Sequence, residues 1–157
     1  MDETLLERIF RALHREKVRY AVFGGIALNL HGIVRTTEDL DIFIEPTEDN
    51  ILRLRVALHS VFTDPAIDEI SAADLLGDYP AVAYVPPDGP FHIDILTRLG
   101  EAFGFEDLET METEFGGVPV PVVTPLMLYR MKRDTARPKD RGDADELRRR
   151  FGFGEKD

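Results

Sequence analysis

The 157-residue sequence contains no cysteine, no tryptophan and no long uninterrupted apolar run. The absence of cysteine excludes disulfides, thiolate metal sites and cysteine nucleophiles, and it suits a cytoplasmic protein. The longest nearly apolar stretch, Tyr20 to Leu30, is interrupted by Asn29 and is too short to cross a bilayer. The N-terminus begins acidic and continues amphipathic, which is not the pattern of a signal peptide. We therefore expect a cytoplasmic protein that does not enter membranes.

Basic residues are also scarce. The sequence has 19 Lys and Arg residues and 30 Asp and Glu residues, which gives a net charge of −11. This imbalance argues against broad electrostatic adhesion to nucleic acid. Residues 1–129 hold nine basic against 23 acidic residues, whereas residues 130–150 hold nine against five. The basic charge is concentrated near the C-terminus, where it indicates either a solvated helical face or a surface that contacts phosphate.

Length and composition predict a single domain that buries its own core. Hydrophobic residues make up 43% of the chain and charged residues 31%, with no internal repeat or low-complexity linker. We expect a core of about residues 18–123 and a C-terminal helical segment of about residues 124–152.

Helical and strand patterns alternate along the chain, which predicts an α+β fold with a mixed sheet. The expected helices are 4–14, 26–31, 47–62, 125–134 and 143–151, and the expected strands are 18–23, 39–44, 81–85, 91–96 and 118–123. The motif "PPDGP" predicts a hairpin between two of these strands. The prolines of "VPVPVV" favour an edge or irregular strand. Residues 63–78 and 101–115 carry no clear pattern.

Two aspartates interrupt the apolar strand "DLDIFI". Side chains alternate between the faces of a strand, so Asp39 and Asp41 share one face. Two adjacent carboxylates repel each other unless solvent or a cation relieves them. The later strand "FHIDIL" places His92 and Asp94 in the same alternation. If the two strands are neighbours, about 4.8 Å apart, the three aspartates form a carboxylate site suited to Mg²⁺ or Mn²⁺.

Gly24 and Gly25 end the preceding strand, 13 residues before Asp39. A strand that turns through two glycines directly into a helix leaves backbone N–H groups that a phosphate can approach closely. Either feature alone is common, since paired glycines usually make only a tight turn. Together they predict a site for a metal ion and a triphosphate.

The string "GGIALNLHGIVRTTEDLDIFI", followed by "FHIDIL", resembles the nucleotidyltransferase fold of the DNA polymerase beta superfamily. It is closer still to the small bacterial and archaeal nucleotidyltransferases related to the AbiEii and AbiGii toxins of abortive-infection and toxin–antitoxin systems. The C-terminal "TPLMLYRMKRDTARPKDRGDADEL" is similar to the ending of that group, in which a lysine on a helix precedes an R-x-K-D-x-x-D segment. The resemblance extends from Val18 to about Leu147.

The resemblance implies roles for individual residues. Gly24 and Gly25 would cradle the triphosphate of a nucleotide, although many members of the family have serine at the second position. Asp39 and Asp41 would bind the metal ions. Asp94 would be the third carboxylate and the base, and Lys132 would lie near the triphosphate.

Two residues beside the aspartates have open roles. Arg35 is expected either to contact a phosphate or to pair with Asp39 or Asp41, since its guanidinium suits both. His92 is favoured as a hydrogen-bond partner of the carboxylates over a metal ligand.

The basic C-terminal segment also has two interpretations. Lys132, Arg137 and Lys139 could surround a triphosphate or an RNA backbone, and this interpretation is favoured for Lys132. Alternatively, the segment is a loop between helices in which Asp140 and Asp143 are caps.

We therefore expect a Mg²⁺- or Mn²⁺-dependent nucleotidyltransferase that transfers a nucleoside monophosphate from an NTP to a hydroxyl of RNA, such as a tRNA 3′ end, or of a protein. The resemblance implies the toxin-type component of a toxin–antitoxin or abortive-infection system, with a cognate antitoxin as partner. The alternative is a non-catalytic nucleotide- or partner-binding module of the same fold, acting as an antitoxin or regulator. A D-x-D motif also serves sugar-nucleotide transferases, but the nearby glycine turn argues against that class.

Overall fold

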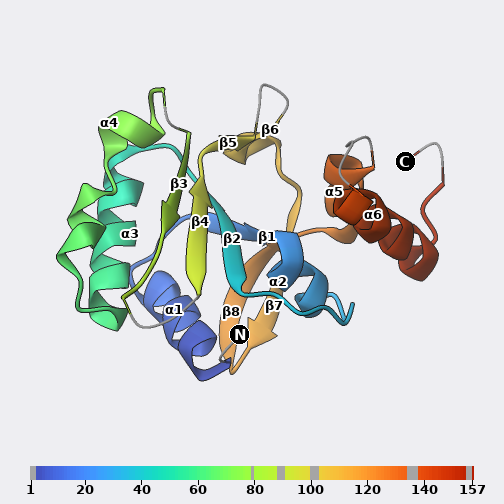
Figure 1. The fold of residues 1–157 in the computed structure, drawn as a ribbon, viewed down its shortest axis with the longest axis horizontal. Coiled ribbons are helices and arrows are strands. Elements are labelled where there is room, and N and C mark those ends of the chain that lie inside the picture. The colour runs from blue at the N-terminus through green and yellow to red at the C-terminus, as the bar shows by residue number, and fades with distance from the viewer. Residues whose placement is uncertain (1–2, 79, 88–90, 100–102, 134–137, 155–156) are drawn as a thin grey trace.

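A six-stranded mixed sheet forms the centre of the computed structural model, which describes residues 3–78, 80–87, 91–99, 103–133, 138–154 and 157 (Figure 1). The strand order is β3-β4-β2-β1-β8-β7. Its strands are β1 Tyr20–Phe23, β2 Asp39–Ile44, β3 Ala81–Tyr84, β4 His92–Leu96, β7 Thr110–Phe115 and β8 Val118–Val123. A short second sheet pairs β5 (Arg98–Leu99) with β6 (Phe103–Gly104). The expected α+β class with a mixed sheet is confirmed.

Helices cover both sides of the sheet (Figure 1). They are α1 Glu3–Arg15, α2 Gly24–Leu30, α3 Glu48–Val61, α4 Ala72–Leu75, α5 Pro125–Lys132 and α6 Pro138–Phe151, with 3₁₀ turns at Pro65–Glu69 and Phe105–Asp107. In the view of Figure 1, α1 and α3 lie on one side of the sheet, and α2, α5 and α6 lie on the other. Among the described residues, no helix has both the length and the apolarity that a bilayer span requires.

The alternation predicted for the two acidic strands is present. Leu40, Ile42, Ile93 and Ile95 are at most 1% exposed, and they belong to the same apolar core as α1 and α3. The acidic side chains of β2 and β4 therefore lie on the opposite face, away from this core. Burial of the apolar face fixes the strand orientation, because a slip of one residue would place carboxylates in the core.

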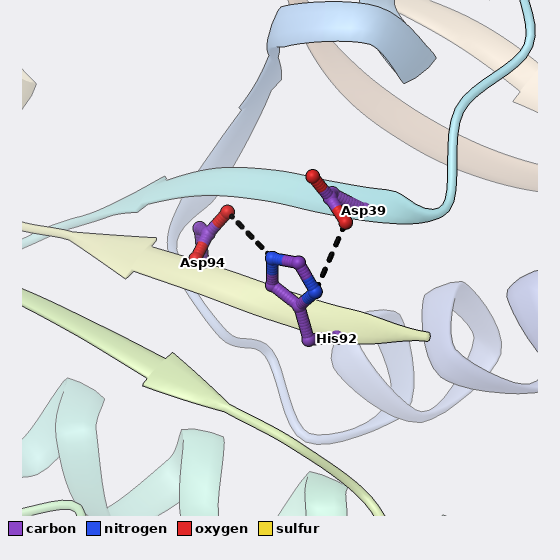
Figure 2. A group of neighbouring side chains, drawn as sticks. All are labelled: Asp39, His92 and Asp94. Carbon is purple, nitrogen blue, oxygen red and sulfur yellow. Dashed lines mark ion pairs between the residues drawn. The ribbon is translucent and has the colours of Figure 1, made fainter. Parts of the chain in front are cut away.

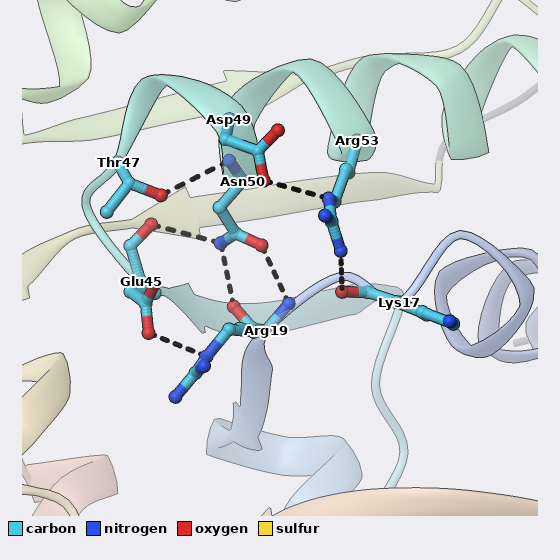
Figure 3. Close-up of polar contacts among 7 residues, drawn as sticks. All are labelled: Lys17, Arg19, Glu45, Thr47, Asp49, Asn50 and Arg53. Carbon is cyan, nitrogen blue, oxygen red and sulfur yellow. Dashed lines mark hydrogen bonds and ion pairs between the residues drawn. The ribbon is translucent and has the colours of Figure 1, made fainter.

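Asn50 joins three elements at the end of the sheet remote from the acidic residues (Figure 3). Its side-chain oxygen accepts from the backbone N–H of Arg19, and its amide nitrogen donates to the carbonyls of Arg19 and Glu45. Thr47 caps α3 by accepting from the Asn50 N–H. The start of β1, the end of β2 and the first turn of α3 are thus held by one buried side chain.

Two expectations from the sequence are wrong. The strand β8 is not at an edge, because it lies between β1 and β7. Its prolines are tolerated since β8 meets β1 at a single register position, Val22 with Val122, beyond Pro119 and Pro121. In addition, α6 begins at Pro138 and not at Asp143, so Asp143 lies inside a helix.

Other segments follow the sequence more closely. The hairpin of β3 and β4 forms as expected, although residues 88–90 of its turn lie outside the described residues. The helix α2 begins at Gly24 itself, so the two glycines form its first turn. The unpatterned residues 63–78 contain a 3₁₀ turn and α4, which are anchored by the buried side chains of Ile67, Ile70 and Leu75.

Candidate active site

The strands β2 and β4 are adjacent and parallel, as the acidic motifs required. Their register pairs Asp39 with His92 and Asp41 with Asp94. Directly paired residues of a parallel sheet project to the same side, so two rows of polar side chains stand on one face. The three predicted carboxylates are therefore brought together, with an imidazole beside them.

The imidazole of His92 lies between two of the carboxylates (Figure 2). Its Nδ1 is 3.0 Å from Asp39 Oδ1, and its Nε2 is 3.3 Å from Asp94 Oδ2. These distances fit a hydrogen-bond partner of the carboxylates, which the sequence favoured, and equally a ligand that shares a cation with them. In addition, each of Asp39, His92 and Asp94 has one atom that could bind a metal ion, and these three atoms lie within 4.8 Å of one another.

Asp41 is a half-buried carboxylate paired with Asp94 across the two strands. Burial, followed by a hydrogen bond with Asp94 and the charges of Asp94 and Asp39, raises the pKa of Asp41 to about 7, against the opposing effect of Lys132. A proton on Asp41 can be shared with Asp94 through this hydrogen bond, which relieves the repulsion that a bare acidic pair would suffer. A divalent cation would provide the same relief.

Gly24 brings the backbone into contact with this carboxylate. A Cβ atom on Gly24 would lie 2.0 Å from Asp41 Oδ2, and Gly24 adopts φ +68°. Both the close approach and the left-handed conformation therefore favour glycine here. At Gly25, a Cβ would lie 3.0 Å from Thr37 Oγ1, so the Thr37 hydroxyl group lies close against this glycine.

A cavity of about 460 Å³ unites the predicted site residues. All seven of them line it: Gly24, Gly25, Arg35, Asp39, Asp41, Asp94 and Lys132. Its remaining lining residues are Phe23, Leu99, Leu128, Met131 and Asp140. The cavity thus has an acidic floor on β2 and β4, a basic side chain from α5, another from the segment before β2, and an apolar wall.

The basic side chains are held by carboxylates of α6. Lys132 Nζ donates to Asp143 Oδ2 at 2.9 Å and to Asp140 Oδ1 at 3.3 Å, and Arg35 Nη1 donates to Asp143 Oδ1. The side chains of Arg35, Lys132 and Asp143 are only 14–16% exposed. Asp143 therefore bridges two cations at the edge of the cavity.

This bridge corrects two expectations. Arg35 pairs with Asp143 and not with Asp39 or Asp41, because α6 begins early enough to bring Asp143 beside it. Asp140 and Asp143 are ion-pair partners within α6, and they do not cap it. Of the other basic candidates, Arg137 and the side chain of Lys139 lie outside the described residues.

Sequence reasoning missed the apolar wall. Leu99 comes from β5, and Leu128 and Met131 come from one face of α5. The spacing of Leu128 and Met131 is ordinary for a helix packed on a core, and β5 has only two residues. No sequence signal separates these positions from core residues.

The donor set fits a divalent cation. Carboxylate oxygens suit Mg²⁺ and Mn²⁺, and an imidazole nitrogen is a common ligand of transition metals. Such a cation would be held by Asp39, Asp41 and Asp94, with His92 adjacent. The geometry agrees with this fit, because Asp39, His92 and Asp94 each offer a ligand atom within 4.8 Å of the other two.

Comparison with known proteins places the chain among nucleotidyltransferases. The family model described as "Nucleotidyl transferase AbiEii toxin, Type IV TA system" matches residues 4–150. No curated protein sequence matches significantly. Several solved structures resemble the fold at low sequence identity.

Three of these structures illustrate the likeness. The crystal structure of ANT(2″)-Ia in complex with adenylyl-2″-tobramycin has a TM-score of 0.57 at 17% identity, covering 96% of this chain and 89% of that chain. The solution structure of the antibiotic-resistance factor ANT(2″)-Ia has a TM-score of 0.55 at 17% identity, covering 96% and 84%. A Thermotoga maritima structure assigned as a nucleotidyltransferase has a TM-score of 0.53 at 15% identity, covering 95% and 91%. At such identities the likeness establishes the fold alone.

Proposed function

The chain belongs to the AbiEii family of nucleotidyltransferase toxins, and from this premise we propose that it transfers a nucleoside monophosphate from an NTP to a hydroxyl of RNA, such as a tRNA 3′ end, or of a protein. Mg²⁺ or Mn²⁺ is the proposed cofactor. The observation that supports this best is the shared cavity, in which three carboxylates, two glycines and Lys132 face one another.

In this proposal the triphosphate lies against the backbone of Gly24 and Gly25, with Lys132 beside it. Since Lys132 is already paired with Asp140 and Asp143, the triphosphate would compete with these carboxylates for its ammonium group. The apolar side chains of Leu99, Leu128 and Met131 offer a surface for the nucleobase. These three side chains carry no hydrogen-bonding group, so we expect weak discrimination among bases by this wall.

The reaction is an in-line displacement at the α-phosphorus. The acceptor oxygen forms a bond to phosphorus, the bond to the β-phosphate oxygen breaks, and pyrophosphate leaves. Asp94 is proposed to accept the hydroxyl proton. Asp39, Asp41 and Asp94 would hold the divalent cation, which when bound supplies charge neutralisation at the phosphates and acidifies the acceptor hydroxyl.

Radiolabelled NTPs test the function directly. The protein is incubated with each α-labelled NTP, Mg²⁺ or Mn²⁺, and total tRNA or a cell lysate, and label is followed into RNA and protein. We expect label in one acceptor class and a loss of at least about 100-fold in Asp39→Asn and Asp94→Asn. Asp68→Asn is the matched control, because this aspartate also pairs with a histidine but lies outside the cavity.

The outcome also separates the enzyme from a binding module. Nucleotide that binds and is recovered intact, with no label in either acceptor class under any metal, would reject transfer. If the same preparation then forms a stable complex with a partner protein, the non-catalytic alternative gains support. Equal labelling by wild type and both site variants would instead reject the assigned carboxylates.

A further inference from the structure

His92 contributes an imidazole to a cluster that otherwise consists of carboxylates. Its two ring nitrogens face different partners, Asp39 at 3.0 Å and Asp94 at 3.3 Å (Figure 2). Extending the metal-dependent function proposed above, we propose that His92 is a direct ligand of the divalent cation and that it makes the site select first-row transition cations over Mg²⁺.

The sheet fixes His92 in this position. It lies on β4, which is paired with β2 on one side and β3 on the other, and its register partner is Asp39. The next residue, Ile93, is fully buried on the opposite face, so the strand cannot turn His92 away from the carboxylates without exposing the core. The imidazole side chain is 31% exposed, which leaves it accessible to a cation that enters from solvent.

The spacing of the polar atoms suits coordination. Adjacent ligand atoms of an octahedral cation lie about 3 Å apart when the bonds are about 2.1 Å. The distance at either ring nitrogen, 3.0 Å from Nδ1 to Asp39 or 3.3 Å from Nε2 to Asp94, is close to that separation. A histidine that binds a metal through one nitrogen usually donates its other N–H to a carboxylate. With a carboxylate beside each nitrogen, His92 can do both.

A nitrogen ligand affects the choice of metal. Mg²⁺ prefers oxygen ligands and retains several waters, so an imidazole adds little to its binding. First-row transition cations accept imidazole readily. Removal of the imidazole should therefore weaken the binding of Mn²⁺ much more than that of Mg²⁺.

Pulsed electron paramagnetic resonance of bound Mn²⁺ tests ligation without measuring catalysis. Tag-free wild-type protein is prepared with natural-abundance histidine and with ¹⁵N-labelled histidine, and each is loaded with Mn²⁺. We expect a ¹⁴N coupling that changes to a ¹⁵N coupling in the labelled protein. Because this comparison uses only the wild type, it does not depend on the folding of any variant. Absence of a histidine nitrogen coupling, or of bound Mn²⁺, would overturn the proposal.

Calorimetric titrations test selectivity. In His92→Gln the dissociation constant for Mn²⁺ should rise at least about tenfold, while that for Mg²⁺ should change less than about threefold. His59→Gln is the matched control, since His59 Nε2 pairs with Asp68 at 2.8 Å outside the cavity, and it should leave both constants unchanged. If the dissociation constants for Mn²⁺ and Mg²⁺ rise equally in His92→Gln, His92 only orients the carboxylates and the proposal is wrong.

The result is separable from the proposed function. Nucleotidyl transfer with Mg²⁺ and no nitrogen coupling would reject His92 as a ligand and retain the enzyme. A nitrogen coupling without transfer from any NTP would retain the ligand and reject the function.

Discussion

Gly24 passes so close to Asp41 that a side chain can fit there only by displacing the carboxylate. We predict that Gly24→Ala lowers nucleotidyl transfer at least about 100-fold, because the carboxylate must rotate out of the cavity. Its free energy of unfolding should fall by only about 1–2 kcal/mol, from the positive φ angle. Label transfer and urea denaturation measure the two effects.

Gly117→Ala is the matched control for this substitution. Gly117 also has a positive φ angle, +80°, but a Cβ there would meet nothing within 4 Å. It should show a similar loss of stability and normal transfer. Normal transfer in Gly24→Ala would contradict the contact between Gly24 and the active carboxylate.

The raised pKa of Asp41 predicts how stability depends on pH in metal-free protein. The folded chain holds a proton on Asp41 up to about pH 7, whereas an unfolded chain releases it near pH 4. The contribution of Asp41 to the free energy of unfolding is therefore greatest below pH 4. This contribution falls by roughly 2–4 kcal/mol as pH rises from about 4 to about 7.

Denaturation in the presence of a chelator checks this sign. In Asp41→Asn the decrease in the free energy of unfolding between about pH 4 and about pH 7 should disappear. The variant should therefore be more stable than wild type at pH 8. Asp49→Asn, at an exposed aspartate whose side chain is 73% accessible, should retain the wild-type slope. If stability depends on pH in Asp41→Asn as steeply as in wild type, Asp41 is not the group responsible.

At the scale of elements, Asp143 links α6 to α5 and to the segment before β2. We predict that Asp143→Ala destabilises the protein by about 1.5–3 kcal/mol, because Arg35 and Lys132 lose a largely buried counter-charge. An NTP should then raise the melting temperature more in this variant than in wild type, since its phosphates replace the lost carboxylate. Asp145→Ala, also on α6 but 61% exposed, is the control. If an NTP raises the melting temperature equally in wild type and in both variants, the proposed competition is contradicted.

The connection between α3 and the sheet depends on Asn50, which is 2% exposed. We predict that Asn50→Leu costs about 1–3 kcal/mol, because the Arg19 N–H loses its side-chain acceptor and the carbonyls of Arg19 and Glu45 each lose one of their two donors. Asp49→Ala, its exposed neighbour, should cost less than about 1 kcal/mol. Chemical denaturation measures both, and similar losses would contradict the role of the buried amide.

The elements also explain which parts of the site could be predicted. Asp39, Asp41 and Asp94 follow from strand alternation, which needs only local periodicity, and their contact needs only that β2 and β4 be adjacent. The bridge made by Asp143 could not be predicted, because it depends on the start of α6 and on how that helix packs. The interior position of β8 was missed for a similar reason, since its prolines obscure a strand that pairs fully on one side only.

At the scale of the whole molecule, charge is distributed unevenly around the cavity. The acidic β2 and β4 form its floor, whereas the basic excess of residues 130–150 falls on α5, α6 and the segment between them. The exposed arginines at the end of α6 include Arg148 and Arg149, with side chains 55% and 75% accessible. An RNA acceptor would gain from this side of the molecule and would be repelled elsewhere.

This asymmetry predicts how an RNA acceptor responds to salt and mutation. Transfer to RNA should fall steeply between about 50 and 200 mM salt, because phosphate contacts release counterions. The double variant Arg148→Glu/Arg149→Glu should lower transfer to RNA at least about tenfold and leave NTP binding within about twofold. Arg8→Glu/Arg53→Glu, which makes the same charge change on α1 and α3, should have a much smaller effect, because these helices lie across the sheet from α6. If both double variants and wild type label their acceptor equally and without salt dependence, RNA is rejected as the acceptor and a protein hydroxyl becomes the better assignment.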